Sequence, residues 1–213
     1  MTIPIGAPRR RSNWRAPSGL AFVLALTLLV LLVEAPASAH HLMGLLQLKP
    51  GPLAGIISGL GHPVLGPDHL LFLLSLGLVG LQQPRRWLLG LLATGLAASG
   101  LGLWLPGLPG AEALVALSLV AVGFVLTGRL PRWILLPAFA LHGYVLSASV
   151  LGWEATPVAF YLLGLLISQA LLLTAAVTLV RRWASQLSPS DLKLASGVLI
   201  GIGASLAWTT LVP

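Results

Sequence analysis

Charged residues are scarce in this chain, and their scarcity limits what it can fold into. Of its 213 residues, 8% are charged and 57% are hydrophobic, whereas a soluble globular domain carries roughly 25% charged residues. Too few polar side chains are present to cover a surface that faces water. We therefore expect an all-α membrane bundle, and the composition excludes an ordinary soluble enzyme or a nucleic-acid-binding domain.

The first 39 residues have the pattern of a secretory signal peptide. Four arginines between residues 9 and 15 precede an uncharged apolar run at 20–33, and the triplet Ala37-Ser38-Ala39 follows. This basic, apolar, A-x-A order is typical of a cleaved leader. The run is also shorter than the roughly 20 residues that a membrane-spanning helix needs. We expect a signal peptide at 1–39 and one transmembrane domain at 40–213; the alternative is an uncleaved first helix.

Six apolar segments after the leader predict six membrane helices. Their expected ranges are 51–82, 86–105, 111–127, 132–151, 157–180 and 192–212. The first is expected to be broken at Gly61–Pro63 and again at Gly66-Pro67, because glycine and proline interrupt helices. Gly197 and Gly201 form a G-x-x-x-G pair in the last segment, a spacing typical of close helix packing.

The basic residues predict the orientation of this bundle. Seven of the eight lysines and arginines after residue 39 fall in the loops 82–86, 127–132 and 181–193. Cytoplasmic loops carry such an excess of positive charge. The expected location is therefore a bacterial inner membrane, with the mature amino terminus on the extracytoplasmic side.

The segment from His62 to His69 contains the most informative polar residues. His62, Asp68 and His69 lie within a long apolar run that two prolines and two glycines interrupt. Ionisable residues at membrane depth tend to line cavities or ion pathways, and imidazole suits nickel, copper and zinc. These three residues are therefore candidate metal ligands, and Asp68 could instead orient a histidine. A turn with a capping aspartate and two hydrogen-bonded histidines is the structural alternative.

Four further polar residues lie in or at the ends of the predicted helices. At 1.5 Å per residue, His69 and His142 lie about 20 and 15 Å from the cytoplasmic ends of their helices. Because these depths are similar, His142 is a fourth candidate ligand, although a helix-to-helix hydrogen bond would also explain it. Glu112 opens a helix and either attracts cations there or stabilises the helix dipole. Tyr161 and Gln169 are expected to pack and to form hydrogen bonds.

The motif H-P-V-L-G-P-D-H-L-L at 62–71 resembles the H-x5-D-H motif of the HupE/UreJ family of nickel permeases. Weaker matches follow in the same order at 111–118, 139–144 and 161–164. The resemblance implies six helices after a cleaved leader and uptake of Ni²⁺, with Co²⁺ as an alternative substrate and no enzymatic activity. It also implies that His62, Asp68 and His69 are essential for transport.

The fourth predicted helix departs from the family pattern. The family commonly carries F-H-G-x-A-H-G-x-E there. In this chain Leu146 replaces the second histidine of that pattern, and Ser149 replaces its glutamate. Residues 142, 146 and 149 would share one face of a helix. That face offers one imidazole and one hydroxyl, and Ser149 is a candidate for a secondary metal contact. Leu73 also replaces a methionine that usually follows the D-H pair.

Cleavage after Ala39 would leave His40 and His41 at the new amino terminus. In the NikM/CbiM metal-uptake subunits, a free amino terminus followed by histidine contributes to the metal site. By analogy, His40 and His41 are candidates for a secondary metal site.

Together these features predict passive or secondary transport of a divalent transition metal into the cytoplasm. The expected partners are the metal ion and the lipid bilayer, with no nucleic acid and no permanently bound cofactor, while a homo-oligomer is left open. No P-loop motif for ATP is present. An intramembrane metal-dependent hydrolase is one alternative, although the chain lacks H-E-x-x-H and G-x-S-x-G. A non-transporting accessory subunit of a membrane complex is another, because ligands are missing from the fourth helix.

Overall fold

The computed structural model describes residues 49, 51–105, 107–150 and 155–212. The predicted signal peptide, His40 and His41 lie outside the described residues. Within them the chain forms α-helices joined by short 3-10 turns, with no strand, as expected for an all-α protein. The α-helices are α3 (Pro52–Leu65), α4 (Pro67–Val79), α5 (Arg85–Gly102), α6 (Ala111–Leu126), α7 (Leu135–Leu146), α8 (Ala155–Trp183) and α9 (Pro189–Leu211).

Two of these helices are long and apolar enough to cross a membrane, namely α8 and α9. A third crossing is counted if α3 and α4, which meet at an angle of 73°, form one bent span. The apolar helices at Ala111–Leu126 and Arg132–Leu146 are shorter. The described helices fall close to the six predicted segments, and the count of six membrane crossings stays a prediction.

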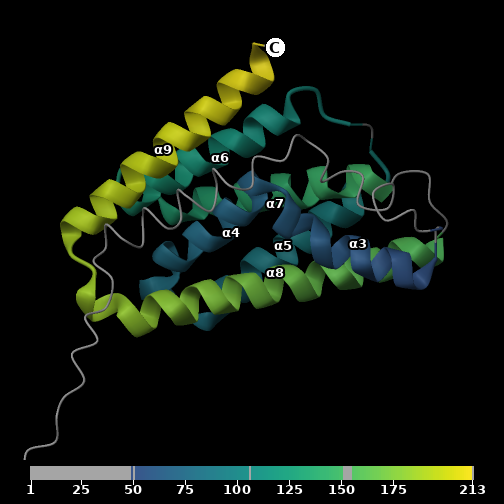
Figure 1. Cartoon of the computed structure of the whole chain (residues 1–213), viewed down its shortest axis with the longest axis horizontal. Helices are drawn as coiled ribbons and strands as arrows, with labels where there is room; N and C mark the ends of the chain where they lie inside the picture. Colours follow the sequence, from purple (N-terminus) through teal and green to yellow (C-terminus); the bar gives the residue numbers. More distant parts are fainter. Residues whose placement is uncertain (1–48, 50, 106, 151–154, 213) are drawn as a thin grey trace, which may run out of the picture.

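The helices pack in pairs around α4 (Figure 1). Helix α3 lies along α8, α6 along α9, and α5 along α7, while α4 contacts both α6 and α8. Helix α4 therefore lies inside the bundle. The sequence motif places His62 on α3 and His69 on α4, and both helices have neighbours that can contact these side chains.

Glycines allow two of these pairs to approach backbone to backbone. A Cβ atom on Gly143 of α7 would lie 2.0 Å from the carbonyl oxygen of Gly95 on α5, and one on Gly59 of α3 would lie 2.2 Å from that of Tyr161 on α8. Small residues permit this kind of packing between membrane helices. The contacts fix how α3 and α7 are rotated about their axes, and so where His62 and His142 point.

The predicted close packing through Gly197 and Gly201 is not found among the described residues. A Cβ atom at either position would have nothing within 4 Å among the described residues. Helices α6 and α9 instead approach at Gly123 and Gly203, because these two glycines face the partner helix and the G-x-x-x-G pair faces away from it.

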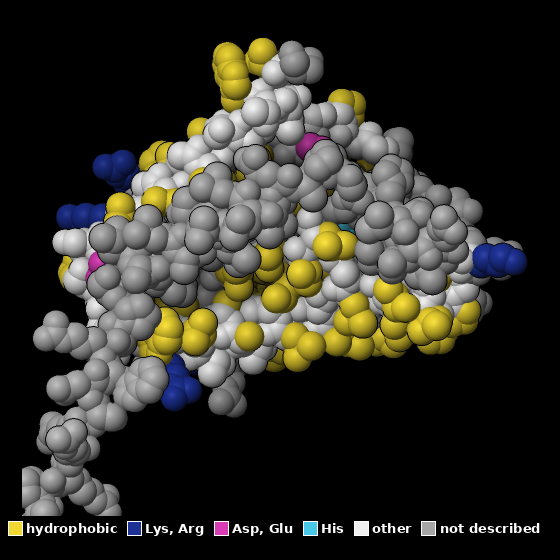
Figure 2. Space-filling model, viewed as in Figure 1, with side chains coloured by type: hydrophobic (Ala, Val, Ile, Leu, Met, Phe, Trp, Pro, Cys, Tyr) yellow, Lys and Arg dark blue, Asp and Glu magenta, His cyan; other side chains and the backbone are white. Residues whose placement is uncertain are grey.

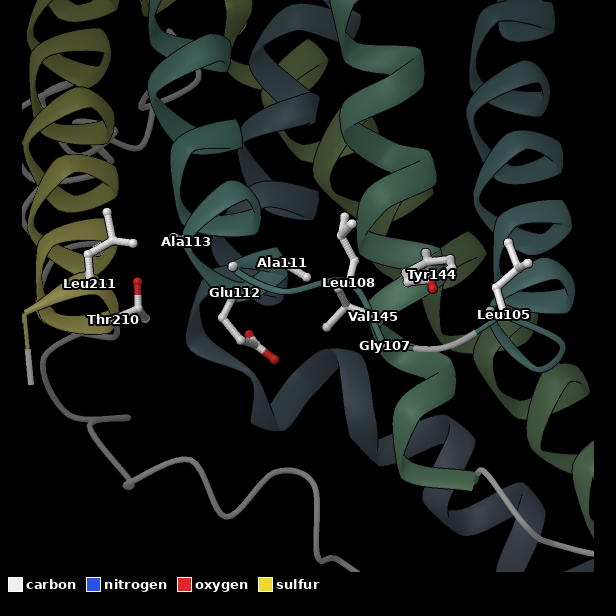
Figure 3. Close-up of a pocket in the computed structure, with 12 residues that line it drawn as sticks. Leu105, Gly107, Leu108, Ala111, Glu112, Ala113, Tyr144, Val145, Thr210 and Leu211 are labelled. Atoms are coloured by element: carbon white, nitrogen blue, oxygen red, sulfur yellow. The ribbon is translucent and has the colours of Figure 1, made fainter.

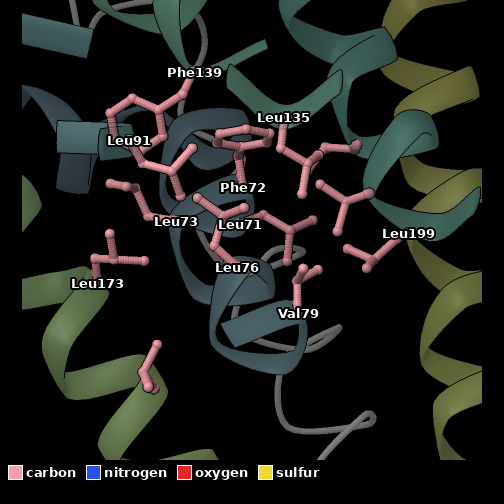
Figure 4. Packing of buried hydrophobic residues seen from close by; sticks show 13 residues of the cluster. Leu71, Phe72, Leu73, Leu76, Val79, Leu91, Leu135, Phe139, Leu173 and Leu199 are labelled. Atoms are coloured by element: carbon pink, nitrogen blue, oxygen red, sulfur yellow. The ribbon is translucent and has the colours of Figure 1, made fainter. Parts of the chain in front are cut away.

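The hydrophobic core surrounds α4 (Figure 4). Phe72 and Leu76 of α4 are fully buried, and the ring of Phe72 lies 6.0 Å from that of Phe139 on α7. Leucines from α5, α8 and α9 complete the cluster, as the sticks in Figure 4 show. Aromatic pairs at this spacing pack favourably, and the cluster holds the first turns of α4 in place.

Large hydrophobic side chains are exposed on the outside of the bundle (Figure 2). Figure 2 shows them gathered along the lower edge, where Figure 1 places α8. Leu163, Ile167 and Leu171 of α8 are among the exposed large hydrophobic residues. A surface of this kind suits a protein that faces lipid.

The three loops predicted to be cytoplasmic lie at one end of the bundle. Arg181 donates through Nη2 to the carbonyl oxygens of Gly80 and Gln83, at 3.1 and 2.8 Å. Arg132 donates through Nη1 to Oε1 of Gln83 at 2.7 Å. Within the third of these loops, Ser188 and Asp191 form a capping box at the start of α9. The basic loops are thus joined to each other, as the orientation argument requires.

Candidate metal site

The sequence motif folds into two helices that meet at Gly66. The backbone of Gly66 is extended, with φ −84° and ψ 108°, and Pro67 begins α4, where its missing N–H is not needed. Asp68 and His69 therefore lie in the first turn of α4. The bend of 73° at this junction turns the first turn of α4 into the interior of the bundle.

The other predicted break, at Gly61–Pro63, is wrong. Helix α3 continues through His62 and Pro63 to Leu65. A proline inside a membrane helix is tolerated when neighbouring side chains satisfy the freed backbone groups. Pro63 removes the helical donor to the carbonyl oxygen of Gly59, and at the next residue the hydroxyl of Ser168 on α8 donates to the carbonyl oxygen of Leu60 at 2.8 Å. His62 consequently projects from a continuous helix.

Asp68 orients the ring of His69. Its Oδ1 accepts hydrogen bonds from the backbone N–H of His69 at 2.8 Å and from Nδ1 of the same residue at 2.9 Å. A carboxylate can only accept, so the proton of a neutral His69 is on Nδ1. The other ring nitrogen, Nε2, then carries a lone pair. It is buried and has no hydrogen-bond partner among the described residues.

His62 and His142 are held by neighbours on other helices. Nδ1 of His62 lies 2.8 Å from the hydroxyl oxygen of Tyr161, which itself donates to the carbonyl oxygen of Leu146. Nε2 of His142 lies 2.7 Å from Oγ of Ser118 on α6. Each imidazole is thus fixed through one ring nitrogen.

The three histidine rings lie close together in the bundle interior. The ring centroids of His69 and His142 are 4.8 Å apart, and those of His62 and His69 are 6.2 Å apart and nearly parallel. The ring of Phe72 stacks on His142 at 4.0 Å. All three histidines are buried, with exposed fractions of 2 to 4%. The structure therefore brings together the four residues that the sequence singled out: His62, Asp68, His69 and His142.

A small cavity lies between His69 and His142. Its volume is about 10 Å³, and its polar lining also includes Gln169 of α8. The remaining walls are apolar and include Leu73 and Leu146. A volume of this size holds one water molecule or one ion without its hydration shell. Within the described ranges, no group of three or more His, Asp or Glu residues is arranged to hold a metal ion.

A larger pocket lies near the first turn of α6 (Figure 3). It has a volume of about 460 Å³ and is lined by the ends of α5, α6, α7 and α9. Figure 3 shows the Glu112 carboxylate between Thr210 of α9 and Val145 of α7. Glu112 lies in the first turn of α6, as predicted, and is within electrostatic range of His69. Tyr144 and Val145 of this pocket directly follow the turn of α7 that carries His142.

The α-helix that the sequence predicted through position 149 ends earlier. Helix α7 ends at Leu146, and Ser149 lies in the 3-10 turn Ser147–Val150 that follows. The i, i+7 spacing that would align it with His142 requires a continuous α-helix.

Sequence reasoning missed the role of Ser118 and understated those of Tyr161 and Gln169. Ser118 is the last residue of the family match at 111–118, and a lone hydroxyl in an apolar run was the available signal. Which helix face each residue occupies depends on glycine contacts between helices, and these could not be read from the sequence.

Comparison with known proteins identifies the family. The family model described as HupE / UreJ protein matches residues 28–206, which is most of the chain. No curated protein and no solved structure matches it. The H-x5-D-H motif at His62, Asp68 and His69 lies inside the matched range. The chain belongs to the HupE/UreJ family.

Proposed function

We propose that this protein transports a divalent transition-metal ion, Ni²⁺ or alternatively Co²⁺, into the cytoplasm by a secondary or facilitated mechanism. The HupE/UreJ family is associated with nickel and cobalt transport or with accessory roles. One observation carries the proposal: the buried Nε2 of His69 lacks a hydrogen-bond partner among the described residues and belongs to a residue that lines an ion-sized cavity.

A cation is the occupant that this nitrogen suits best. A buried polar atom left unpaired costs about 1 to 3 kcal/mol, so its presence calls for a ligand. The lone pair of a neutral imidazole binds Ni²⁺, Co²⁺, Cu²⁺ and Zn²⁺, and the second imidazole, His142, lines the same cavity. Asp68 supplies a negative charge beside His69 without being needed as a direct ligand.

The open arrangement fits a transport site. An ion that passes through must bind strongly enough to enter and weakly enough to leave. Two imidazoles and one amide around the cavity give fewer ligands than a permanent metal centre needs. His62, whose ring is stacked near His69, would be the next contact along the path.

Access from outside would run through the Glu112 pocket. A pocket of about 460 Å³ accommodates a hydrated ion, and the Glu112 carboxylate raises the local concentration of cations. His40 and His41, at the proposed mature amino terminus, and Ser149 are proposed as further candidates for secondary metal contacts. The membrane potential favours inward movement: two charges crossing 100 mV gain roughly 4.6 kcal/mol, at about 2.3 kcal/mol per charge.

Metal uptake by cells that express the protein tests this proposal. Accumulation of nickel, cobalt, zinc and manganese is measured for the wild type and for His62→Ala, Asp68→Ala and His69→Ala at equal membrane abundance. Asp191→Asn, which changes an exposed carboxylate in the α9 capping box, is the control. Uptake of one metal that all three variants lose and the control retains supports the proposal. No uptake of any metal, or uptake indifferent to the three changes, overturns it.

The accessory-subunit alternative rests on the apolar cavity walls. Leu73 and Leu146 supply no ligand where the family pattern offers sulfur and imidazole. If this alternative holds, the protein purifies with a stoichiometric partner and is inactive without it.

A further inference from the structure

The hydroxyl of Ser118 lies between the ring of His142 on α7 and the backbone of α6, the helix that carries Ser118. It lies on α6, is 4% exposed, and its Oγ is 2.7 Å from Nε2 of His142. The same oxygen donates to the carbonyl oxygen of Val115 at 2.6 Å. Both contacts are as short as good hydrogen bonds, so the hydroxyl takes part in two bonds at once.

These two bonds fix where the proton of His142 lies. A serine hydroxyl has a single proton, and a carbonyl oxygen can only accept. Since the Ser118 proton is directed at Val115, the Ser118 oxygen must accept at the other contact. The donor there is the Nε2–H of His142. A neutral His142 therefore carries its lone pair on Nδ1.

We propose that Ser118 is a positioning residue that holds His142 in the Nε2–H tautomer, so that Nδ1 can bind a divalent transition-metal ion. The metal-binding part of this inference rests on the proposed transport function, whereas the tautomer does not. Hydrogen bonds of this kind commonly set the tautomer and ring orientation of metal-binding histidines.

The two neighbouring histidines would then hold opposite tautomers. Asp68 keeps the proton of His69 on Nδ1, and Ser118 keeps that of His142 on Nε2. Each ring is thus anchored through its N–H and has a lone pair on the remaining nitrogen. A His142 with its proton on Nδ1 would offer a hydrogen-bond donor at that atom, and a donor cannot ligate a metal.

Ser75 provides a matched control within the same bundle. It lies on α4, is 1% exposed, and its hydroxyl donates to the carbonyl oxygen of Phe72 at 2.7 Å, the same three-residue spacing as in Ser118 and Val115. In the described part of the chain it has no hydrogen bond to a histidine. Loss of either hydroxyl removes a similar buried bond, but only Ser118→Ala frees an imidazole.

Nitrogen NMR of the metal-free, full-length protein labelled with ¹⁵N in its histidine rings reads the tautomer directly. The signal of His142 is identified by its absence in His142→Asn. The expected result is a protonated Nε2 and an unprotonated Nδ1 in the wild type and in Ser75→Ala. Ser118→Ala should shift His142 toward a mixture of tautomers, and Ser118→Thr, which keeps a hydroxyl, should restore the single form. A wild-type His142 protonated at Nδ1 overturns the inference.

Uptake kinetics test the consequence for the metal. Ser118→Ala should raise the half-saturating metal concentration about 10- to 100-fold, the range found for partners of metal-binding residues, with a smaller change in maximal rate. Equal effects of Ser118→Ala and Ser75→Ala overturn the positioning role. If the tautomer is as expected but neither the wild type nor any variant moves metal, the proposed transport function is overturned and the tautomer assignment stands. If the wild type moves metal while its His142 is protonated at Nδ1, the inference about Ser118 is overturned and the transport function stands.

Discussion

The rings of His69 and His142, on helices α4 and α7, lie edge to face with their centroids 4.8 Å apart. Both rings are buried, both line one cavity of about 10 Å³, and Nε2 of His69 has no partner among the described residues. The two imidazoles are therefore close enough to reach the same ion in this cavity, and the lone pair of His69 Nε2 is available to a cation. The mechanism proposed above depends on this relationship.

The role of Asp68 can be separated from that of a metal ligand. Its Oδ1 accepts two hydrogen bonds from His69, and the carbonyl oxygen of an asparagine could accept the bond from Nδ1. We therefore expect Asp68→Asn to raise the half-saturating metal concentration less than Asp68→Ala, for which about 10- to 100-fold is expected. Metal uptake at a series of concentrations measures both. Equal losses in the two variants would indicate that the charged carboxylate itself binds the ion.

A histidine at position 146 should strengthen metal binding. Leu146 lines the cavity together with His69 and His142, so Leu146→His adds a third imidazole. A gain of about 1.4 kcal/mol would be a tenfold lower dissociation constant, which titration calorimetry of the purified protein with Ni²⁺ would detect. Val145→His, at the neighbouring position that faces the Glu112 pocket, is the control. Unchanged affinity in Leu146→His would show that the cavity does not hold the ion.

Tyr161 should stabilise the bundle as well as the site. Its hydroxyl accepts from His62 and donates to the carbonyl oxygen of Leu146, and the residue is fully buried. Tyr161→Phe removes both of these hydrogen bonds, at a cost of about 1 to 3 kcal/mol. A lower melting temperature in detergent and reduced uptake are expected together. Wild-type melting and uptake would contradict the assigned contacts.

The contact between α5 and α7 predicts a severe effect for a small substitution. The Cβ of Gly143→Ala would lie 2.0 Å from the carbonyl oxygen of Gly95, so the two helices would have to separate and carry His142 with them. Loss of folded protein or of uptake is expected. Gly197→Ala, where the added atom meets nothing within 4 Å, should be neutral or stabilising by up to about 1 kcal/mol. Size-exclusion chromatography and uptake measure both, and equal tolerance of the two changes would contradict the packing.

Glu112 should act through charge alone. Since it is exposed in a wide pocket, Glu112→Gln should raise the half-saturating metal concentration a few-fold at low ionic strength and less at high salt, because exposed charges are screened. Asp191→Asn should show no such salt-dependent difference. A loss in Glu112→Gln that salt does not reduce would instead indicate direct coordination.

Much of this arrangement could be predicted from the sequence because apolar runs and their boundaries determine where helices lie. The bend at Gly66 falls at a predicted interruption, since Pro67 suits the first position of a new helix. The second predicted interruption was wrong because α3 tolerates Pro63. Counting residues from the helix ends placed His69 and His142 at similar depth, and in the structure they meet.

The rotation of each helix about its axis could not be predicted. It is set by contacts between backbones, such as Gly143 against Gly95, and such contacts depend on which helices are neighbours. For this reason the contact between Ser118 and His142 could not be predicted, although a lone hydroxyl in an apolar run marked Ser118 as unusual. The same reason applies to the G-x-x-x-G pair at 197 and 201. Its spacing permits close packing, but it does not identify the partner helix.

The most direct test is metal influx into lipid vesicles that contain only this protein. With an inside-negative potential, we predict saturable influx of Ni²⁺ or Co²⁺ through the wild type and none above background through His69→Ala or His142→Ala. No influx of either ion, or influx that both variants retain, would contradict the conclusion that these two histidines form the transport site.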